Sequence, residues 1–445
     1  MKEKVVLLGA GSAMFTRGLL NDLVRRDWDV ELGLVDVDAG ALAVAAGLAR
    51  KIIEAKRPHM RLQASTDRRP ILKGATVVVC TVGVGGRRAW EQDVFIPRKY
   101  GIFQPVGDTV MPGGSSRALR MIPAMVDIAK DLLELAPHAL FFNYGNPITA
   151  VCRAVHKATG ADIIGLCHGV HAVAQTLAKV LGAPPQELTY TAVGLNHLTW
   201  FTDVRVRGVA ALPRLKQIAH EKVSQRLSAG EQFKAGADDY PFTWHMLDLF
   251  GAFPCVLDRH IVEFFPWMFP GGQYYGKKLG LDAYSFEDVI TWGDKVFEQM
   301  KQDALSPRKL DDEFFKQFGG EHEQVIDIVE SVRKCDGRIY SANLPNQGQV
   351  PNLPADAVLE APALAAGGTL KAIQQGALPA GLTGTLATRL AYVETLVEAA
   401  LEGSREKFIQ ALVLDGAVTS LDTATRLADE LLKAQAQYLP QFKPL

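Results

Sequence analysis

The sequence has few cysteines and no long apolar segment. Its 445 residues include five cysteines, an odd number that is scattered along the chain: Cys80, Cys152, Cys167, Cys255 and Cys335. This is a poor disulfide framework and suits a reducing compartment. No segment reaches the roughly 18 uninterrupted apolar residues of a transmembrane helix. The amino-terminal apolar run at residues 5–8 is interrupted by Gly9, so it is too short for a signal peptide. We therefore expect a cytoplasmic protein with no membrane partner.

An excess of charge of one sign is also lacking. The chain has 48 basic and 49 acidic residues and a formal net charge of −1. The chain therefore lacks the excess of positive charge that nucleic-acid binding would require, so a small molecule is the expected partner. The chain is 48% hydrophobic and longer than a single hydrophobic core usually accommodates. Its length therefore predicts two or three packing units.

Short apolar runs alternate with amphipathic stretches of helical length over the first 166 residues. The apolar runs lie at residues 5–8, 32–35, 76–80, 139–142 and 163–166, and the helical stretches at 17–26, 39–55 and 118–135. Continuous apolar strands that alternate with helices predict a doubly wound parallel sheet with helices on both faces.

The pattern changes near residue 190. Two strands are expected at residues 189–193 and 200–206, followed by helices at 211–228, 283–303, 385–402, 404–413 and 420–437. We therefore predict a nucleotide-binding domain at residues 1–190. A mixed α+β, helix-rich second domain follows at residues 191–445. Gly/Pro-rich stretches at 105–114 and 270–281 are expected to be loops over a site.

The first predicted strand runs into a glycine turn, Gly9-Ala10-Gly11-Ser12. Such a turn before a helix places backbone N–H groups against a pyrophosphate, although Met14 replaces the third glycine of the Rossmann fingerprint. Asp36 ends the second strand, where a carboxylate accepts from the ribose hydroxyls of NAD and repels the extra phosphate of NADP. Asp38 is a candidate helix cap. We predict NAD binding by five residues: Gly9, Gly11, Ser12, Asp36 and Thr81.

Three polar side chains follow predicted strands at the ligand-binding edge of the sheet. Cys167 and His168 follow the run at 163–166, and Asn146 follows the run at 139–142. His197 lies in a turn between two strands. Taken alone, Cys167 fits a small buried residue and His197 a hydrogen-bonded core histidine, and their spacing matches no zinc finger. Asn146 either caps the following helix or donates to a ligand.

Together these motifs resemble those of glycoside hydrolase family 4, the NAD- and divalent-metal-dependent glycosidases related in fold to lactate and malate dehydrogenases. The motifs occur in order over most of the chain: Gly9-Ala10-Gly11-Ser12, Gly85-Gly86, Ile96-Pro97 with Tyr100-Gly101, Asn146-Pro147, Cys167-His168-Gly169-Val170, Gly194-Leu195-Asn196-His197 and Asn343-Leu344-Pro345-Asn346. Each motif is modest alone, and the set is specific.

The resemblance implies a glycosidase outside the usual two-carboxylate scheme. The sugar is oxidised at C3 by NAD, a base removes the C2 proton, the aglycone leaves by elimination, water adds, and C3 is reduced again. Cys167 and His197 would bind the metal, usually Mn²⁺ in this family, which also holds sugar O2 and O3. A thiolate and an imidazole suit zinc or iron better by softness, so manganese rests on the resemblance. Asn146 would contact the sugar near O3, and His168 would lie beside the scissile bond.

The residue after the cysteine carries specificity in this family. Cys-His resembles members acting on unphosphorylated α-glucosides, α-galactosides and α-uronides, whereas Cys-Asn or Cys-Asp accompanies 6-phosphoglycosides. Because a phosphosugar-type acid is absent at His168, the resemblance leaves the general acid open. In the loop at 101–114, Gln104 and Asp108 fall where members contact the sugar.

The base has two candidates. Asp258 is one, because a carboxylate with a tuned pKa can remove an activated C–H proton, and its alternative is an ion pair with Arg259. Tyr240 is the other, because some members of the family use a tyrosine. Arg259 could instead bind the carboxylate of a uronic acid in a bidentate way. His260 and Glu263 occupy positions where a histidine and a glutamate recur in α-galactosidase-like members.

Arg117 and Arg120 stand three residues apart on one predicted helical face. They point into the site or form a solvated stripe, and solvation is the default expectation.

We therefore predict an NAD- and divalent-metal-dependent α-glycosidase for small unphosphorylated glycosides, with α-uronides as the close variant. The family habit predicts a homodimer or a homotetramer. An NAD-dependent 2-hydroxy-acid dehydrogenase of the lactate/malate type is the alternative enzyme, and it would leave the pair Cys167 and His197 unexplained. A catalytically silent NAD sensor would bind NAD and no metal.

Overall fold

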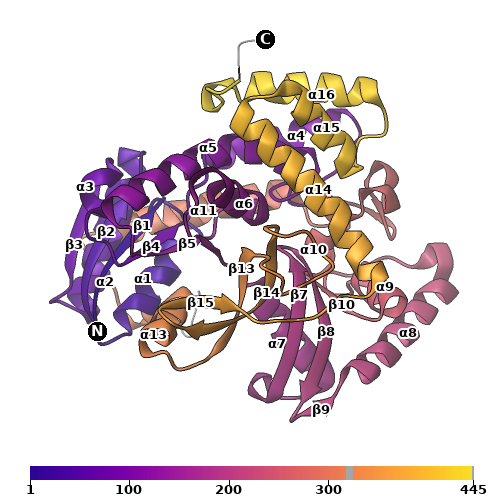
Figure 1. Cartoon of the computed structure of the whole chain (residues 1–445), viewed down its shortest axis with the longest axis horizontal. Coiled ribbons are helices and arrows are strands. Elements are labelled where there is room, and N and C mark those ends of the chain that lie inside the picture. Colours follow the sequence, from indigo (N-terminus) through magenta and orange to yellow (C-terminus); the bar gives the residue numbers. More distant parts are fainter. Residues whose placement is uncertain (317–323, 443–445) are drawn as a thin grey trace.

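The computed structural model describes residues 1–316 and 324–442. Within these residues, thirteen strands form one sheet with the order β10-β8-β7-β14-β13-β6-β5-β4-β1-β2-β3, and β15 and β9 pair with β14 and β8. The sheet runs through the whole molecule, and helices cover it on both sides (Figure 1).

The first half contains the predicted doubly wound parallel sheet. Its six parallel strands lie in the order β3-β2-β1-β4-β5-β6, which is that of a dinucleotide-binding domain. The strands are β1 (Lys2–Leu8), β2 (Asp29–Val35), β3 (Arg61–Ser65), β4 (Val77–Cys80), β5 (Leu140–Asn143) and β6 (Ile164–Gly165). The helices are α1 (Thr16–Val24), α2 (Ala39–Lys56), α3 (Arg68–Leu72), α4 (Gly86–Lys99), α5 (Met111–Leu135), α6 (Ile148–Thr159) and α7 (Gly169–Leu181).

The continuous apolar runs are explained by burial on both faces. Val6 and Leu8 of β1 belong to one hydrophobic cluster, whereas Val5 and Leu7 belong to the cluster on the opposite face. A strand that packs helices against both of its faces has no solvent-facing position for a polar residue.

The second half continues the same sheet with antiparallel strands. These are β7 (Leu188–Leu195), β8 (Leu198–Val206), β9 (Val209–Ala210), β10 (Phe253–Cys255), β13 (Ile339–Pro345), β14 (Val358–Ala366) and β15 (Thr369–Ala372). The pair β13 and β14 lies between β6 and β7, so strands from the last third of the chain join the two halves. The domain boundary at residue 190 stays a prediction, and the sheet passes across it.

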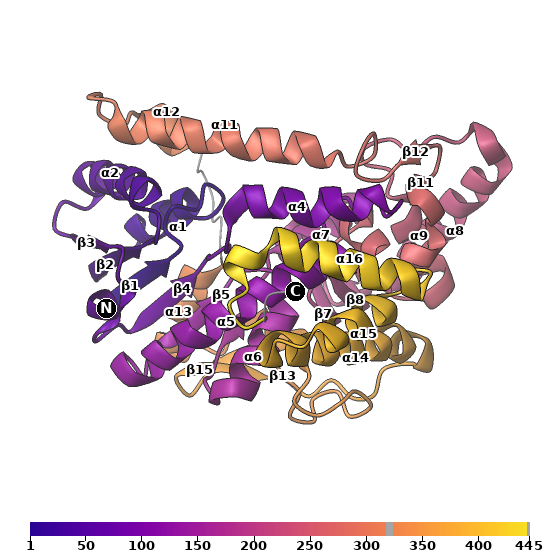
Figure 2. The same cartoon turned by 90° about the horizontal axis from the view of Figure 1, so that it is seen from above.

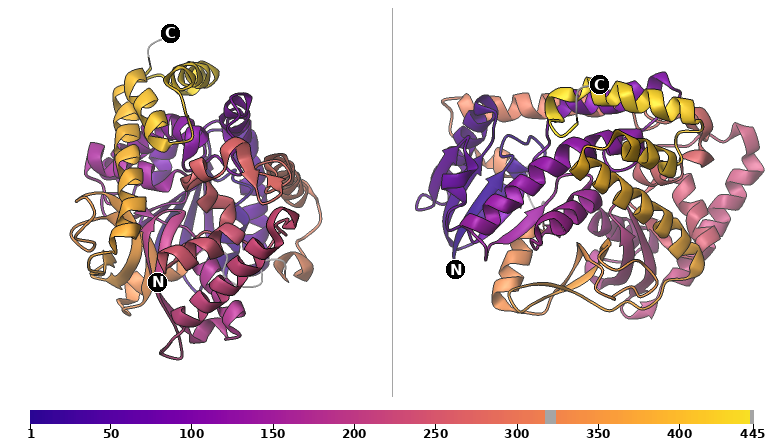
Figure 3. Two further views of the ribbon diagram at one scale, coloured as in Figure 1. Left: turned by 90° about the vertical axis from the view of Figure 1, so that its right-hand side faces the viewer. Right: turned by 45° about the horizontal axis from the view of Figure 1, so that its top comes forward.

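The remaining helices cover the sheet and the first half. They are α8 (Leu212–Ala229), α9 (Pro241–Phe250), α10 (Asp258–Ile261), α11 (Phe286–Leu305), α12 (Asp312–Lys316), α13 (Val325–Lys334), α14 (Ala380–Glu402), α15 (Arg405–Asp415) and α16 (Leu421–Ala434); a small separate hairpin is formed by β11 (Gln273–Tyr274) and β12 (Lys277–Lys278). Helix α11 crosses back over α2 (Figure 2). Helices α14 and α15 pack on α5, and α16 packs on α4 (Figure 3).

Two expectations about the region around α5 were wrong. Helix α5 begins at Met111, so the last four residues of the expected loop at 105–114 are helical. The solvated arginine stripe is also absent: Arg120 is buried and its guanidinium makes a bidentate ion pair with buried Asp93, with one N–O distance of 2.8 Å. A second partner, the backbone oxygen of Val84, accepts from Arg120 Nε.

No helix among the described residues is long and apolar enough to cross a membrane.

Candidate active site

The glycine turn after β1 is packed too tightly for any other residue. Gly9 has φ +82°, and a Cβ on it would lie 2.8 Å from the backbone nitrogen of Val82. A Cβ on Gly11 would lie 2.5 Å from the Cβ of Ala41. The hydroxyl of Thr81 donates to the carbonyl oxygen of Gly9 at 3.0 Å. Both glycines are therefore required by the close approach of the neighbouring strand and helix.

Asp36 is held beside this turn. Its carboxylate accepts from the N–H of Gly11 at 2.8 Å and from the N–H of Asp38 at 3.0 Å. Asp38 itself is the expected helix cap of α2, because its side chain accepts from the N–H groups of Gly40 and Ala41. Asp36 is thus placed at the carboxyl end of β2, as the sequence predicts.

The surroundings of Asp36 fit an adenosine group. Val37 is 88% exposed and Met14 is 56% exposed, so large apolar side chains face solvent on both the Asp36 segment and the glycine turn. Apolar surface next to a carboxylate that can accept from ribose hydroxyls is what an adenosine requires. The residues present therefore fit a dinucleotide, with Ser12 in the turn between β1 and α1.

A second group of polar side chains meets at the carboxyl edge of the sheet. One carboxylate oxygen of Asp108 and one ring nitrogen each of His197 and His260 all lie within 4.8 Å of one another. Asp108 precedes α5, His197 lies in the turn between β7 and β8 with φ +68°, and His260 lies on α10. The two imidazole rings have centroids 4.2 Å apart. Three distant segments thus converge on one point.

Hydrogen bonds connect this group to Asn146. The side-chain amide of Asn146 donates to Asp108 Oδ2 at 2.8 Å, and Thr109 Oγ1 lies 2.8 Å from Asp108 Oδ1 and 2.9 Å from His197 Nδ1. Arg117 Nε donates to the carbonyl oxygen of Asn146 at 3.0 Å. Helix α6 has Pro147 at its N-cap and no side-chain cap. Asn146 therefore joins this hydrogen-bonded group and does not cap the helix.

The electrostatics of the group favour cation binding. Burial lowers the pKa of His197 to about 4 and lowers that of His260 well below its ordinary value. Burial acts to raise the pKa of Asp108, but His197, His260 and Arg117 together outweigh it, so the pKa of Asp108 is lowered. The pKa of each of the three groups is thus lowered, which favours the deprotonated forms that metal ligands require. The residues present therefore fit a divalent metal ion.

Cys167 and His168 lie on the same edge, directly after β6. Cys167 is half-buried, and its Sγ accepts from the N–H of Gly169 at 3.3 Å. His168 is exposed at this edge. Cys167 is not part of the group of three ligand atoms found within the described residues. The predicted ligand His197 is thus joined with Asp108 and His260, and Cys167 lies outside this group.

Asp258 has a fully occupied carboxylate. It is buried and accepts from the N–H groups of Phe242 and Thr243 at 2.9 and 2.7 Å, from the Thr243 hydroxyl at 2.5 Å and from the Tyr274 hydroxyl at 2.6 Å. Burial raises its pKa, and these hydrogen bonds oppose the rise. The alternative interpretation, an ion pair with Arg259, was wrong for the described residues, because the Asp258 carboxylate accepts from Phe242, Thr243 and Tyr274 instead.

The other two candidates of this region are placed differently. Tyr240 has a left-handed backbone, with φ +44°, immediately before α9, and its hydroxyl donates to Asp238 at 3.0 Å. Burial, together with Asp238, raises the pKa of Tyr240 to about 12. Arg259 is half-buried, and its Nε has no hydrogen-bond partner in the described part of the chain.

Glu263 has a positional role that sequence reasoning missed. Its Oε1 accepts from the N–H groups of Val106 and Gly107, both at 2.8 Å, and the side chain is 1% exposed. Burial raises the pKa of Glu263 to about 8. Glu263 thus fixes the backbone just before Asp108. Glu263 itself lies three residues after His260 in the chain. The recurrence of a glutamate at this position was the only signal for it in the sequence.

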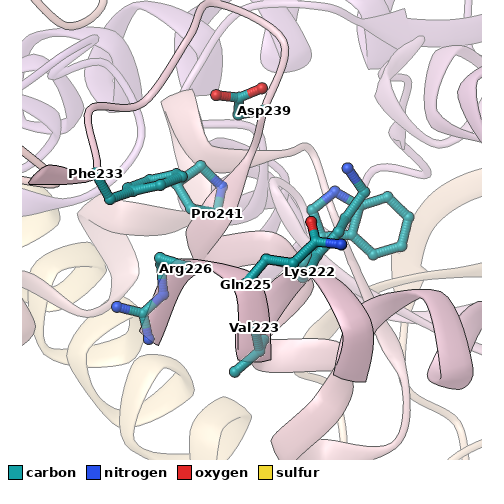
Figure 4. A pocket seen from close by; sticks show the side chains of 8 residues that line it. Lys222, Val223, Gln225, Arg226, Phe233, Asp239 and Pro241 are labelled. Carbon is teal, nitrogen blue, oxygen red and sulfur yellow. The ribbon is translucent and has the colours of Figure 1, made fainter. Parts of the chain in front are cut away.

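A separate cavity of about 320 Å³ lies between α8 and α9 (Figure 4). It is lined by Lys222, Val223, Gln225, Arg226, Phe233, Asp239, Pro241 and Trp244. Lys222 Nζ lies 5.4 Å from the centre of the Trp244 ring. None of the sequence-predicted site residues lines this cavity, and only Tyr240 lies next to it in the chain.

Comparisons with known proteins match the whole chain. The family model described as family 4 glycosyl hydrolase matches residues 4–183, and the model of the C-terminal domain of that family matches residues 192–418. An α-galactosidase of Rhizobium meliloti is 31% identical in an alignment of 458 positions that covers 99% of this chain and 89% of the relative. An α-galacturonidase of Thermoanaerobacterium saccharolyticum is 28% identical over 99% of this chain and 97% of its own length.

The fold is also found in solved structures. A 6-phospho-α-glucosidase from gut microorganisms, solved in complex with NAD and Mn²⁺, has a TM-score of 0.83 and 21% identity, and the match covers 100% of both chains. At this identity the likeness establishes the fold.

Proposed function

The chain belongs to the family 4 glycosyl hydrolases, and from this premise we propose that it hydrolyses small unphosphorylated α-glycosides with the help of NAD and a divalent metal ion, Mn²⁺ first. The proposal rests on one observation: a candidate dinucleotide site and a candidate cation site lie at the same edge of the sheet. The glycine turn with Asp36 fits a dinucleotide, and the group of Asp108, His197 and His260 fits a cation. A hydrolase of the two-carboxylate type needs neither.

When bound, NAD supplies a reversible hydride acceptor for C3 of the sugar, and the metal ion supplies Lewis acidity to the sugar oxygens. Five residues would hold NAD: Gly9, Gly11, Ser12, Asp36 and Thr81. Cys167 and His197 are the metal ligands that the family motifs imply.

Asn146 is proposed to orient the sugar. Its amide nitrogen donates to Asp108, whereas its Oδ1 is buried and has no partner among the described residues. An amide oxygen accepts up to two hydrogen bonds, so Asn146 Oδ1 can accept from a sugar hydroxyl. Asp108, tied to Asn146 and Thr109, is held where it can accept from a neighbouring hydroxyl.

Tyr240 is proposed as the base that removes the C2 proton. The Asp258 carboxylate already accepts four hydrogen bonds, so proton uptake there would break contacts that hold the start of α9. The Tyr240 hydroxyl donates to Asp238, and because its pKa is raised to about 12, it acts as a base only when a bound cation lowers that pKa and stabilises the phenolate. Exposed His168 is proposed to protonate the leaving oxygen.

This assignment is tested by following C2 exchange in deuterated water. Tyr240→Phe should abolish exchange and leave the urea midpoint unchanged, whereas Asp258→Asn should lower the urea midpoint. If Tyr240→Phe exchanges the C2 proton at the wild-type rate, Asp258 would be the base instead. The same conclusion would follow if Asp258→Asn lost exchange at unchanged stability.

An α-uronide is the form of the substrate that Arg259 favours. Its guanidinium is half-buried beside the site and has no acidic partner within the described ranges, and Nε is left without an acceptor. A uronic carboxylate would accept from such a guanidinium in a bidentate way. The similarity to an α-galacturonidase agrees with this choice.

The deciding experiment is a panel of nitrophenyl α- and β-glycosides, uronides and 6-phosphates, each with and without NAD and Mn²⁺. Cleavage of α-glycosides or α-uronides that requires both additions supports the proposal. Arg259→Gln should reduce kcat/KM for the uronide by about 10-fold or more and change the neutral sugar little. NAD reduction without cleavage would indicate a dehydrogenase, and NAD binding without Mn²⁺ binding would indicate a sensor.

We also propose a cytoplasmic homodimer or homotetramer. The five reduced cysteines agree with a reducing compartment. Analytical ultracentrifugation and cell fractionation test these two points.

A further inference from the structure

We propose that the cavity between α8 and α9 binds the group that leaves from the sugar, and that it selects a leaving group with a carboxylate beside a flat apolar face. An aromatic acid and a second uronic acid both have this chemistry. The inference rests on the proposed function for the cleavage step. Binding of a free aromatic acid to the cavity can be measured without any cleavage.

The cavity has the size of one ring and its substituents. Its volume of about 320 Å³ lies at the lower end of the roughly 300–1,000 Å³ of ligand pockets in proteins. Two aromatic side chains contribute to its wall: Phe233, which is half-buried, and Trp244, which is 4% exposed. Aromatic rings bind other flat apolar surfaces by burial of area and by stacking. The wall therefore fits a single flat group.

Two cations in the wall have no carboxylate partner in the described part of the chain. Arg226 contacts Nδ1 of His245 at 3.4 Å, and its guanidinium carbon lies 5.3 Å from the centre of the Tyr275 ring. The buried Nε of Arg226 has no hydrogen-bond partner there. Lys222 Nζ lies 5.4 Å from the centre of the Trp244 ring. A buried guanidinium nitrogen without an acceptor is costly unless a ligand supplies one, so the cavity favours an anion.

The acidic residue of the wall lies apart from these cations. Asp239 Oδ2 accepts from the backbone N–H of Gly236 at 2.6 Å. Figure 4 shows Asp239 on the other side of the cavity from Arg226. A ligand thus meets positive charge on α8 and a hydrogen-bond acceptor opposite. An acid that also has a hydroxyl group satisfies both sides, because its carboxylate accepts from Arg226 and its hydroxyl donates to Asp239.

The start of α9 is shared by the cavity and the candidate active site. Pro241 and Trp244, three residues apart on one face of α9, line the cavity. The backbone N–H of Thr243 donates to Asp258 at 2.7 Å, and Asp258 lies two residues before His260 in the chain. The same helical turn therefore contacts the cavity and is hydrogen-bonded to the segment that carries His260.

Tyr240 relates the cavity to the reacting carbon atoms. It lies between Asp239 and Pro241, which both line the cavity. The proposed base acts on C2 of the sugar, and the leaving oxygen is bonded to C1, so that this oxygen is only two bonds from C2. A sugar whose C2 faces Tyr240 therefore has its leaving group beside the cavity.

The first test is calorimetric binding of 4-methoxybenzoate and of the neutral 4-methoxybenzamide to the whole protein, without NAD, metal or sugar. The acid should bind at least about 10-fold more tightly than the amide. Arg226→Gln should remove this preference, whereas Lys222→Gln should reduce it by about threefold, because Lys222 is exposed. Lys216→Gln is the matched control, since it removes an exposed charge of α8 outside the cavity, and it should leave the preference unchanged.

The second test places the same groups on a substrate. One pair of α-glycosides has 4-carboxyphenyl and 4-carbamoylphenyl leaving groups, and another has a uronic acid and the matching neutral sugar. In Arg226→Gln, kcat/KM for the acid relative to its neutral counterpart should fall by about 10-fold, and in Lys216→Gln it should not change. Comparison with the wild type cancels the intrinsic reactivities of the leaving groups. The pair that responds identifies the leaving group as an aromatic or a sugar acid.

Equal binding of the acid and the amide, or a preference that persists in folded Arg226→Gln, would overturn the anion site. Circular dichroism and thermal melting establish that each variant is folded. A preference in binding with no change of either kcat/KM ratio would overturn the role in holding the leaving group and indicate an effector site. A protein that binds 4-methoxybenzoate through Arg226 and cleaves no glycoside retains the anion site and loses both the leaving-group role and the proposed function.

Discussion

Replacement of Glu263 tests whether a buried carboxyl group fixes the loop that carries Asp108. Oε1 of Glu263 accepts two backbone hydrogen bonds of 2.8 Å, from Val106 and Gly107, and the side chain is 1% exposed. In Glu263→Ala both N–H groups lose their acceptor inside the protein. A buried donor left unsatisfied costs about 1–3 kcal/mol, so the two together cost about 2–6 kcal/mol.

Glu263→Gln keeps the acceptor and removes the ability to ionise. The amide oxygen of glutamine can accept from the same two N–H groups. Burial raises the pKa of Glu263 from the ordinary 4.5 to about 8, so the folded protein holds this carboxyl group protonated at neutral pH. The glutamine therefore resembles the protonated folded state, and at pH 5 we expect its free energy of unfolding to lie within about 1 kcal/mol of that of the wild type.

The pH dependence of stability has a definite sign. Because the pKa of Glu263 is higher in the folded protein than in the unfolded chain, its contribution is complete below about pH 4.5 and is lost as the pH rises through 8. A pKa of about 8 against 4.5 corresponds to an upper limit of about 5 kcal/mol. Glu263→Gln lacks this titration, so it should be the more stable protein at pH 9.

The assay is urea unfolding of the metal-free protein at pH 5, 7 and 9. We expect wild type and Glu263→Gln to be close together at pH 5 and Glu263→Gln to be the more stable at pH 7 and 9, with Glu263→Ala well below Glu263→Gln at each pH. Mn²⁺ affinity should fall in Glu263→Ala alone. Equal losses in the two variants at every pH, or a wild-type stability that does not fall relative to Glu263→Gln between pH 5 and 9, would refute the reasoning.

Two further predictions concern other parts of the molecule. Asp36→Ala should weaken NAD binding by about 10-fold or more and reduce the preference over NADP, because hydrogen bonds to a charged group contribute about 1.5–3 kcal/mol; fluorescence titration with both dinucleotides measures this, and an unchanged ratio of affinities contradicts it. Arg120→Met leaves Asp93 buried without its ion-pair partner and should cost about 3–5 kcal/mol; adding Asp93→Leu should restore part of the loss in urea unfolding, and no recovery in the double variant would count against a buried-charge penalty.

Local features of the first half could be predicted from the sequence because they depend on near neighbours. The apolar runs, the glycine turn and the Asp38 cap are set by residues within a few positions of one another. The predicted strand at residues 5–8 and helix at 39–55 lie within β1 and α2. Periodicity and turn chemistry contain this information.

Long-range features could not be predicted in this way. Strands β13 and β14 insert between β6 and β7, and no local pattern marks which strands will pair. Arg120 looked solvated because helical spacing does not reveal Asp93, which is 27 residues away. Thr109 and His197, which contact each other, are 88 residues apart. The convergence of Asp108, His197 and His260 depends on the assembled sheet, so the motifs predict a ligand role for His197 and none for His260.

The measurement that tests the central claim most directly is the fate of the C2 proton during cleavage in deuterated water. A nitrophenyl α-glycoside or α-uronide is incubated with the protein, NAD and Mn²⁺, and the released sugar is analysed by nuclear magnetic resonance. The account predicts one deuterium at C2, and no cleavage when either NAD or Mn²⁺ is withheld. Cleavage without NAD that leaves the C2 proton in place would contradict it.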